Sequence, residues 1–168
     1  IKMLLEREDV NINSSDGDGQ TPLLWAAWNG HGGVVRMLLE REVVNINTPD
    51  EYGQTPLFGA AWNGHEGVVQ MLLEREDVGI NLLDKTAQTL LLWAASTGHD
   101  GIVKLLLDQG DVNSETPNKE NQTPLSLALS GRHDEAVRLL REGGKQNPDT
   151  SSPDSQTPLP SLRRKGES

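Results

Sequence analysis

The chain has 168 residues, a formal net charge of −10 and no cysteine. Its length suits one ordinary domain, and the lack of cysteine excludes disulfides, thiolate nucleophiles and cysteine-ligated zinc from these residues. The longest unbroken apolar run, from Leu90 to Ala95, has six residues, whereas a membrane-spanning helix needs about eighteen or more. Because phosphate-binding surfaces need clustered Lys and Arg, we expect neither nucleic acid nor a membrane as partner. No basic and apolar leader opens the sequence, so we expect a cytoplasmic protein.

An internal repeat runs through most of the chain. The string Gln-Thr-Pro-Leu recurs, with one variant, and its threonines are 34 residues apart: Thr21, Thr55, Thr89, Thr123 and Thr157. Residues 19–42 and 53–76 are identical at 20 of 24 positions. All four histidines follow their threonine by ten residues: His31, His65, His99 and His133. A fixed period of this length predicts similar units stacked in a row, because one unit alone could not bury its apolar face.

The first complete unit shows the elements expected in each repeat. Thr21 is expected to cap a first helix whose first residue is proline, and Asn29-Gly30 is expected to end it. The apolar residues inside that helix follow the i, i+3, i+4 spacing of a packed face. A second helix is expected to bury Val34, Val35, Met37, Leu38 and Leu39. Residues 43–53 then form an extended, turning connection to the next threonine.

The motifs Gly-x-Thr-Pro-Leu, Ala-Ala, Gly-His and Val-Val-x-x-Leu-Leu, at these spacings, resemble the ankyrin-repeat family. The resemblance implies an all-α repeat solenoid of stacked helix-turn-helix units with β-turn or hairpin loops. Four copies are expected, at residues 16–49, 50–83, 84–117 and 118–151. Residues 1–15 are expected to be the second half of a preceding repeat, and residues 152–168 a flexible tail with a vestigial repeat start that Pro160 interrupts. Leu24, Phe58, Leu92 and Ser126 replace the histidine that usually follows Thr-Pro-Leu, and the period is 34 rather than the usual 33.

The fourth copy carries a more polar second helix than the others. Arg141 stands where Leu39 and Leu73 contribute an apolar side chain, and Ala136 replaces a valine. Terminal repeats need a polar outer face. We therefore expect this copy to act as a C-terminal cap.

The repeat pattern offers no candidate residues for catalysis or for metal binding. The histidines occupy one repeat position, and stacked equivalents would lie about 10 Å apart, too far to share a metal through bonds of about 2 Å. We expect their rings to bond to nearby loop backbone. The carboxylates recur at the two ends of the second helix, where acids suit a first turn and a solvated face. We expect no enzyme activity, no catalytic residue, no cofactor and no metal.

The six aromatic residues avoid every second helix. Tyr52 precedes its threonine by three residues, and the others follow theirs by three, four or seven: Phe58, Trp25, Trp93, Trp28 and Trp62. In ankyrin-like stacks the turns and first helices line a concave groove, so the resemblance implies that these residues face a protein partner. We expect Trp28 and Trp62 to be exposed. Trp25 and Trp93 either line the groove or fill the gaps between repeats.

The turns add polar candidates to this predicted groove. The full set of expected partner-binding residues is Asp18, Gln20, Trp25, Trp28, Asn29, Glu51, Tyr52, Gln54, Phe58, Trp62, Asn63, Lys85, Gln88, Trp93, Ser96, Thr97, Lys119 and Gln122. Asp18 and Glu51 near its mouth favour a neutral or mildly basic partner. Exposed tryptophan and tyrosine are enriched among residues that dominate binding energy.

The phrases Asn-Gly-His-Glu-Gly-Val-Val and Leu-Leu-Glu-Arg-Glu-Asp-Val are similar to those of ankyrin arrays in fungal NOD-like receptors. That resemblance implies a C-terminal, ligand-sensing region for non-self recognition or innate immunity, attached to a nucleotide-binding oligomerisation domain. Self-association of the parent protein would then use other domains. The alternative is a constitutive scaffold or adaptor that binds one fixed protein partner.

Overall fold

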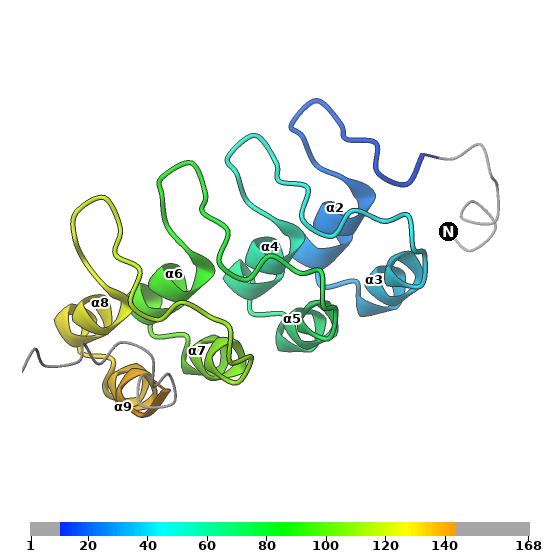
Figure 1. The fold of residues 1–168 in the computed structure, drawn as a ribbon. Coiled ribbons are helices and arrows are strands. Elements are labelled where there is room, and N and C mark those ends of the chain that lie inside the picture. The colour runs from blue at the N-terminus through cyan, green and yellow to red at the C-terminus, as the bar shows by residue number, and fades with distance from the viewer. Residues whose placement is uncertain (1–10, 144–168) are drawn as a thin grey trace, which may run out of the picture.

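The computed structural model describes residues 11–143, which form four helix pairs and no strand. The helices are α2 (Pro22–Trp28), α3 (Gly32–Leu39), α4 (Pro56–Trp62), α5 (Glu66–Leu73), α6 (Leu90–Thr97), α7 (Asp100–Leu107), α8 (Pro124–Gly131) and α9 (Asp134–Gly143). Even-numbered helices form one layer and odd-numbered helices a second, while the long turns project side by side from the first layer (Figure 1). This arrangement confirms the predicted all-helical repeat solenoid. The expected tail at 152–168, with Pro160, and most of the expected half-repeat at 1–15 lie outside the described residues.

Threonine starts every first helix, as predicted. The hydroxyl oxygens of Thr21, Thr55, Thr89 and Thr123 each accept the backbone N–H three residues later, at 3.2 to 3.3 Å. This bond satisfies one of the free N–H groups at the helix start. The residue that donates is the one that replaces the usual family histidine, so its backbone keeps a capping role whatever side chain it carries.

The first helices end in a left-handed residue. Gly30, Gly64 and Gly98 have φ between 69° and 72°, and Arg132 takes the equivalent place in the fourth repeat with φ of 58°. Glycine has no Cβ to clash in this conformation, whereas arginine does. The fourth repeat therefore makes the same turn with more backbone strain.

The core lies between the two layers and between neighbouring repeats. Ala26, Ala27 and Leu23 of α2 are at most 1% exposed, and the same positions are buried in α4 and α6. Small alanines let the first helices approach closely, and α2 packs on α4 as α6 packs on α8. In α3 the buried side chains are Val35 and Leu38, while Val34, Met37 and Leu39 are only half-buried. In α3 the expected apolar face is therefore buried less completely than predicted, although Val34 and Leu39 still pack against the core.

Asparagine side chains join the loops of successive repeats. The amide of Asn47 donates to the Asp77 carbonyl and accepts the Gly79 N–H, both at 2.7 Å. Asn13 bonds in the same way to the loop after α3, and Asn81 to the loop after α7. These three asparagines are spaced by 34 residues. Each one ties the backbone of its own loop to that of the next repeat.

The last repeat leaves apolar surface on its outer side. Leu129 of α8 is 49% exposed, although Ala27, Ala61 and Ala95 at the equivalent position are fully buried by the following repeat. On α9 the surface is charged, and Arg138 pairs with both Glu135 and Glu142. The described part of the fourth repeat thus combines a polar second helix with an uncovered leucine on its first helix. None of the helices in this part of the chain is long and apolar enough to cross a bilayer.

Candidate functional site

The turns and first helices form one continuous side of the molecule. The second helices cover the opposite side of the first helices (Figure 1), so exposed first-helix side chains point away from that layer. We call this side the first-helix surface. Its exposed or half-buried members include Asp18, Trp25, Trp28, Glu51, Tyr52, Trp62, Lys85 and Lys119.

Aromatic exposure on the first-helix surface is uneven. Tyr52, Trp25 and Trp62 are 62%, 51% and 46% exposed, and Trp28 is half-buried. Trp93 and Phe58 are each only 6% exposed. The expected exposure of Trp62 is confirmed, whereas Trp28 is less exposed than expected because it lies against Gly59.

Phe58 and Trp93 are corrections to the expected set of surface residues. The ring centroids of Trp93 and Trp62 lie 5.0 Å apart in a stacked arrangement, and Phe58 lies 5.8 Å from each of these two rings. Because neighbours cover both side chains, Phe58 and Trp93 belong to the core and support Trp62 from below. Trp93 fills a gap between repeats, which was one of the two alternatives for it.

One pairing rule explains why equivalent tryptophans differ in exposure. The residue seven positions after the threonine packs on the residue four positions after the next threonine. Trp28 lies against Gly59, where an added Cβ would meet its ring at 2.9 Å. Trp62 instead stacks on the broad indole of Trp93. Because that ring fills the space that, in the preceding pair, Gly59 leaves open for Trp28, Trp62 is held farther out toward the surface. Trp25 holds the same repeat position as Trp93, but no first helix among the described residues covers it.

The histidines connect neighbouring repeats or rest on tryptophan. The Nε2 atoms of His65 and His133 lie 3.1 Å from the carbonyl oxygens of Trp28 and Ser96 in the preceding repeats. His31 and His99 lie against the indoles of their own repeats, Trp25 and Trp93, at 5.2 and 4.7 Å. Two rings therefore bond to backbone as expected, although the backbone belongs to the preceding repeat.

The polar first-helix candidates are largely engaged in local bonds. Asn29 and Asn63 donate side-chain amides to the carbonyls of Trp25 and Gly59. Ser96 and Thr97 donate their hydroxyls to the Trp93 carbonyl. These groups end the helices, and they still keep partly exposed edges at the first-helix surface.

The turns are built around one acceptor side chain each. Oδ1 of Asp16, Asp50, Asp84 or Asn118 accepts two backbone N–H groups at 2.8 to 3.0 Å. One of these belongs to the half-buried Gln20, Gln54, Gln88 or Gln122. The glutamine backbones therefore fix the turns, while Asp18, Glu51, Lys85 and Lys119 form the exposed tips.

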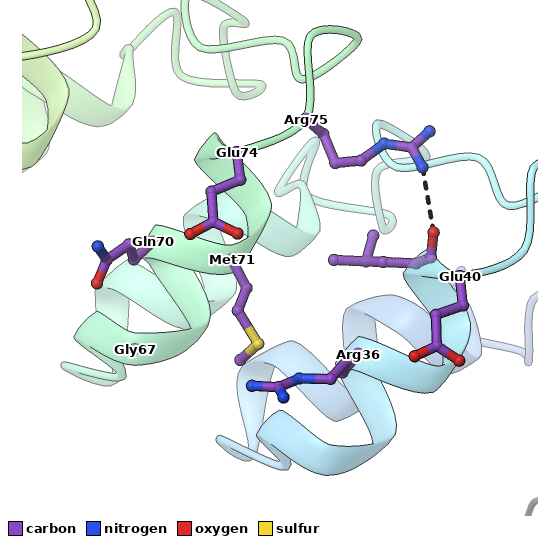
Figure 2. Close-up of a pocket in the computed structure, with 8 residues that line it drawn as sticks. Arg36, Glu40, Gly67, Gln70, Met71, Glu74 and Arg75 are labelled. Atoms are coloured by element: carbon purple, nitrogen blue, oxygen red, sulfur yellow. Dashed lines mark hydrogen bonds between the residues drawn. The ribbon is translucent and has the colours of Figure 1, made fainter.

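The sequence analysis did not predict a hollow that lies between α3 and α5. It holds about 730 Å³ and is lined by Arg36, Leu39, Glu40, Gly67, Gln70, Met71, Glu74 and Arg75 (Figure 2). Arg75 donates to the Leu39 carbonyl at 3.1 Å and pairs with Asp77 at 2.9 Å, and this pairing lowers the pKa of Asp77. Arg36 and Gln70 occupy the same position in the first two repeats, which are otherwise nearly identical. This difference was the sequence signal that could have pointed to the hollow.

Metal-binding side chains do not form a cluster in the described part of the chain. Between residues 11 and 143, no three His, Asp or Glu side chains are placed to hold one metal ion. The structural features that stand out are the aromatic stack under Trp62 and the charged turn tips. Both suit contact with another macromolecule.

A comparison with models of protein families agrees with this architecture, whereas no curated protein matches the chain in sequence. The family model described as ankyrin repeats (3 copies) matches residues 1–84 and 76–154. These matches span most of the sequence, and the helix pairs, capping threonines and projecting turns lie inside them: the chain belongs to the ankyrin-repeat family.

Proposed function

We propose that this chain is a non-catalytic module that binds a protein partner on the first-helix surface. Ankyrin repeats are generally protein–protein interaction modules. The observation that supports this surface is Trp62, which is 46% exposed and rests on the buried rings of Trp93 and Phe58. A large aromatic held by a packed base presents contact area at little cost in conformational entropy.

The second helices support this choice of side by contrast. Among residues 11–143 they hold no aromatic side chain, and their exposed positions are mainly charged. The hollow between α3 and α5 has two arginines and two glutamates along it, a mixture typical of a solvated surface. The first-helix surface is therefore the better binding candidate.

Replacement of Trp62 by alanine tests the proposal. A display library of random 12-residue peptides is selected on the full chain, and the selected peptides are measured on Trp62→Ala. We expect affinity to fall by at least tenfold, because a central aromatic contact contributes on the order of 2 kcal/mol or more. The unfolding free energy should fall by only about 1–2 kcal/mol, since the side chain is half exposed.

The matched control is Val43→Ala, which shortens a side chain that is 72% exposed beyond the end of α3. This variant should bind the peptides as the original chain does. Retained binding by folded Trp62→Ala would contradict the proposed surface. Denaturant titration of both variants separates lost binding from lost folding.

We further propose that the module is the ligand-sensing region of a larger cytoplasmic receptor of the fungal NOD-like type, acting in non-self recognition or innate immunity. The support is the similarity of the phrases at residues 63–69 and 72–78 to those of such arrays. Sequencing the gene upstream of this chain tests the idea. A phosphate-binding loop followed by an acidic strand is expected, and their absence would leave the constitutive adaptor as the better reading.

A further inference from the structure

Tyr52 is the most exposed aromatic side chain of the first-helix surface, at 62%. The same repeat position holds Asp18, Thr86 and Glu120 in the other turns. No ring of the described residues stacks on Tyr52, in contrast to Trp62. Among the four turns, that of the second repeat is therefore the one that presents an aromatic ring at this position, and a face of that ring is open to a partner.

The turn that carries Tyr52 is held on both sides. Oδ1 of Asp50 accepts the Tyr52 N–H at 2.9 Å, and the Tyr52 carbonyl accepts the Lys85 N–H at 3.0 Å. On the other side, the Glu51 N–H donates to the Asp18 carbonyl at 3.1 Å. Because these bonds fix the backbone before binding, little ordering cost remains for a partner.

Two carboxylates beside Tyr52 make no ion pair within the described part of the chain. The neighbouring Glu51 carboxylate, together with Asp18 and Asp50, raises the pKa of Tyr52. Residues 16–31 and 50–65 contain four acidic residues and no Lys or Arg. Asp16 and Asp50 are already used by turn N–H groups. Of the acids that raise the Tyr52 pKa, Asp50 is buried, whereas Asp18 and Glu51 are exposed.

We propose that the partner presents an arginine to Tyr52, with its guanidinium against the phenol ring and hydrogen-bonded to Glu51 and Asp18. This inference rests on the proposed function and specifies its partner. Arginine suits the place better than lysine, because its planar fork can stack on a ring and bond two carboxylate oxygens together. A second contact of the same partner, an apolar side chain, lies on Trp62.

The charges of the neighbouring turns predict in which direction the partner runs along the repeats. Lys85 and Lys119 occupy the place of Glu51 in the third and fourth repeats, and both are exposed. Because the exposed Glu120 adjoins Lys119 and offsets its charge, Lys85 is the cation that attracts an acidic residue of the partner. With repeats about 10 Å apart and an extended peptide advancing about 3.3 Å per residue, the acidic residue should lie roughly three residues from the arginine.

The peptides selected on the full chain provide the test. We expect arginine to be enriched among them, with Asp or Glu at that separation. A selected peptide should lose about fivefold in affinity on Glu51→Gln and more on the double variant Asp18→Asn/Glu51→Gln. The same peptide with its arginine replaced by glutamine should show no further loss on these variants. The matched control, Glu76→Gln, removes an exposed charge beyond α5 and should leave affinity unchanged.

The outcomes separate this inference from the proposed function. Peptides that depend on Trp62 but lack arginine, or bind equally well to Glu51→Gln, would overturn the arginine contact and leave the proposed surface standing. Equal losses on Glu76→Gln and Glu51→Gln would also overturn it, because the effect would be one of net charge. Selected peptides that ignore Trp62, or a selection that yields none, would count against both.

Discussion

At the scale of single residues, the turns depend on one left-handed backbone position two residues before each threonine. Gly19 and Gly53 hold it with φ of 79° and 82°, whereas Ala87 and Asn121 hold it with φ of 62° and 59°. Asparagine tolerates this region better than alanine. Ala87 is therefore the most strained of the four.

The replacement Ala87→Gly should stabilise the chain. Removing the Cβ relieves the left-handed strain, and we expect the unfolding free energy measured in urea to rise by about 1 kcal/mol. The reverse change, Gly53→Ala, should destabilise the chain, because its new Cβ would lie 2.9 Å from the Lys85 nitrogen. A neutral or destabilising Ala87→Gly would show that the turn carries no strain.

The same residue explains a missing bond between turns. The turns of repeats one to three are joined by backbone bonds from Glu51 to Asp18 and from Lys85 to Tyr52. Within the described residues, the equivalent bond from Lys119 to Thr86 is not formed, and Lys119 Nζ lies 3.5 Å from the Lys85 carbonyl instead. A methyl group on Ala87 at the contact accounts for the missing bond, as the Cβ clashes at Gly19 and Gly53 indicate.

Asn47 tests the asparagine bridges between loops. Asn47→Ala removes one donor and one acceptor that link two repeats, and we expect a loss of about 1–3 kcal/mol in unfolding free energy. Asn45→Ala, which removes only a local bond to the Asn47 N–H, is the control and should cost less than half as much. Equal losses in chemical denaturation would mean that the bridge adds nothing beyond local turn structure.

At the scale of elements, the short first helices depend on their caps. Helix α6 has eight residues, and isolated helices shorter than about twelve residues are marginal in water. Packing against α8 and the bond from Leu92 N–H to Thr89 together keep it folded. The cap also sets the point where the extended turn becomes helix.

Thr89→Ala should therefore cost about 1–2 kcal/mol. Thr89 is only 2% exposed, so water cannot replace the lost oxygen. Thr89→Ser keeps that oxygen and should recover most of the loss in thermal or urea unfolding. A serine variant as unstable as the alanine variant would assign the effect to the lost methyl group rather than to the cap.

At the scale of the whole molecule, a residue's contribution depends on whether another repeat follows it. Leu91 and Leu125 hold the same repeat position in α6 and α8. Leu91 is 1% exposed beneath the fourth repeat, whereas Leu125 is only partly buried. Stacked repeats obtain much of their stability from such interfaces.

The paired substitutions Leu91→Ala and Leu125→Ala measure this difference directly. We expect a loss of roughly 3–4 kcal/mol for Leu91→Ala, because it leaves a cavity between two repeats. Leu125→Ala should cost about half as much. Equal losses in the two urea titrations would indicate that the outer side of the fourth repeat is covered by other parts of the chain.

Much of the repeat architecture could be predicted from local patterns. The threonine caps, the helix-ending glycines and the apolar spacing each depend on a few neighbouring residues. Each recurs every 34 residues, except that Arg132 replaces the glycine in the fourth repeat. The candidate surface was less predictable. Phe58 was expected on it, and Trp93 was left between the surface and the gaps between repeats. Both lie in the core, because their exposure depends on the side chain of an adjacent repeat.

The sequence by itself determined the helical repeat, its period and the lack of aromatics on the second helices, because these follow from spacing along the chain. Only the tertiary structure decided which rings are exposed. Trp28 settles on Gly59 while Trp62 stands on Trp93, a contact between residues 31 apart that no local pattern specifies. The free face of Tyr52 and its unpaired carboxylates likewise emerge only when neighbouring turns hydrogen-bond side by side.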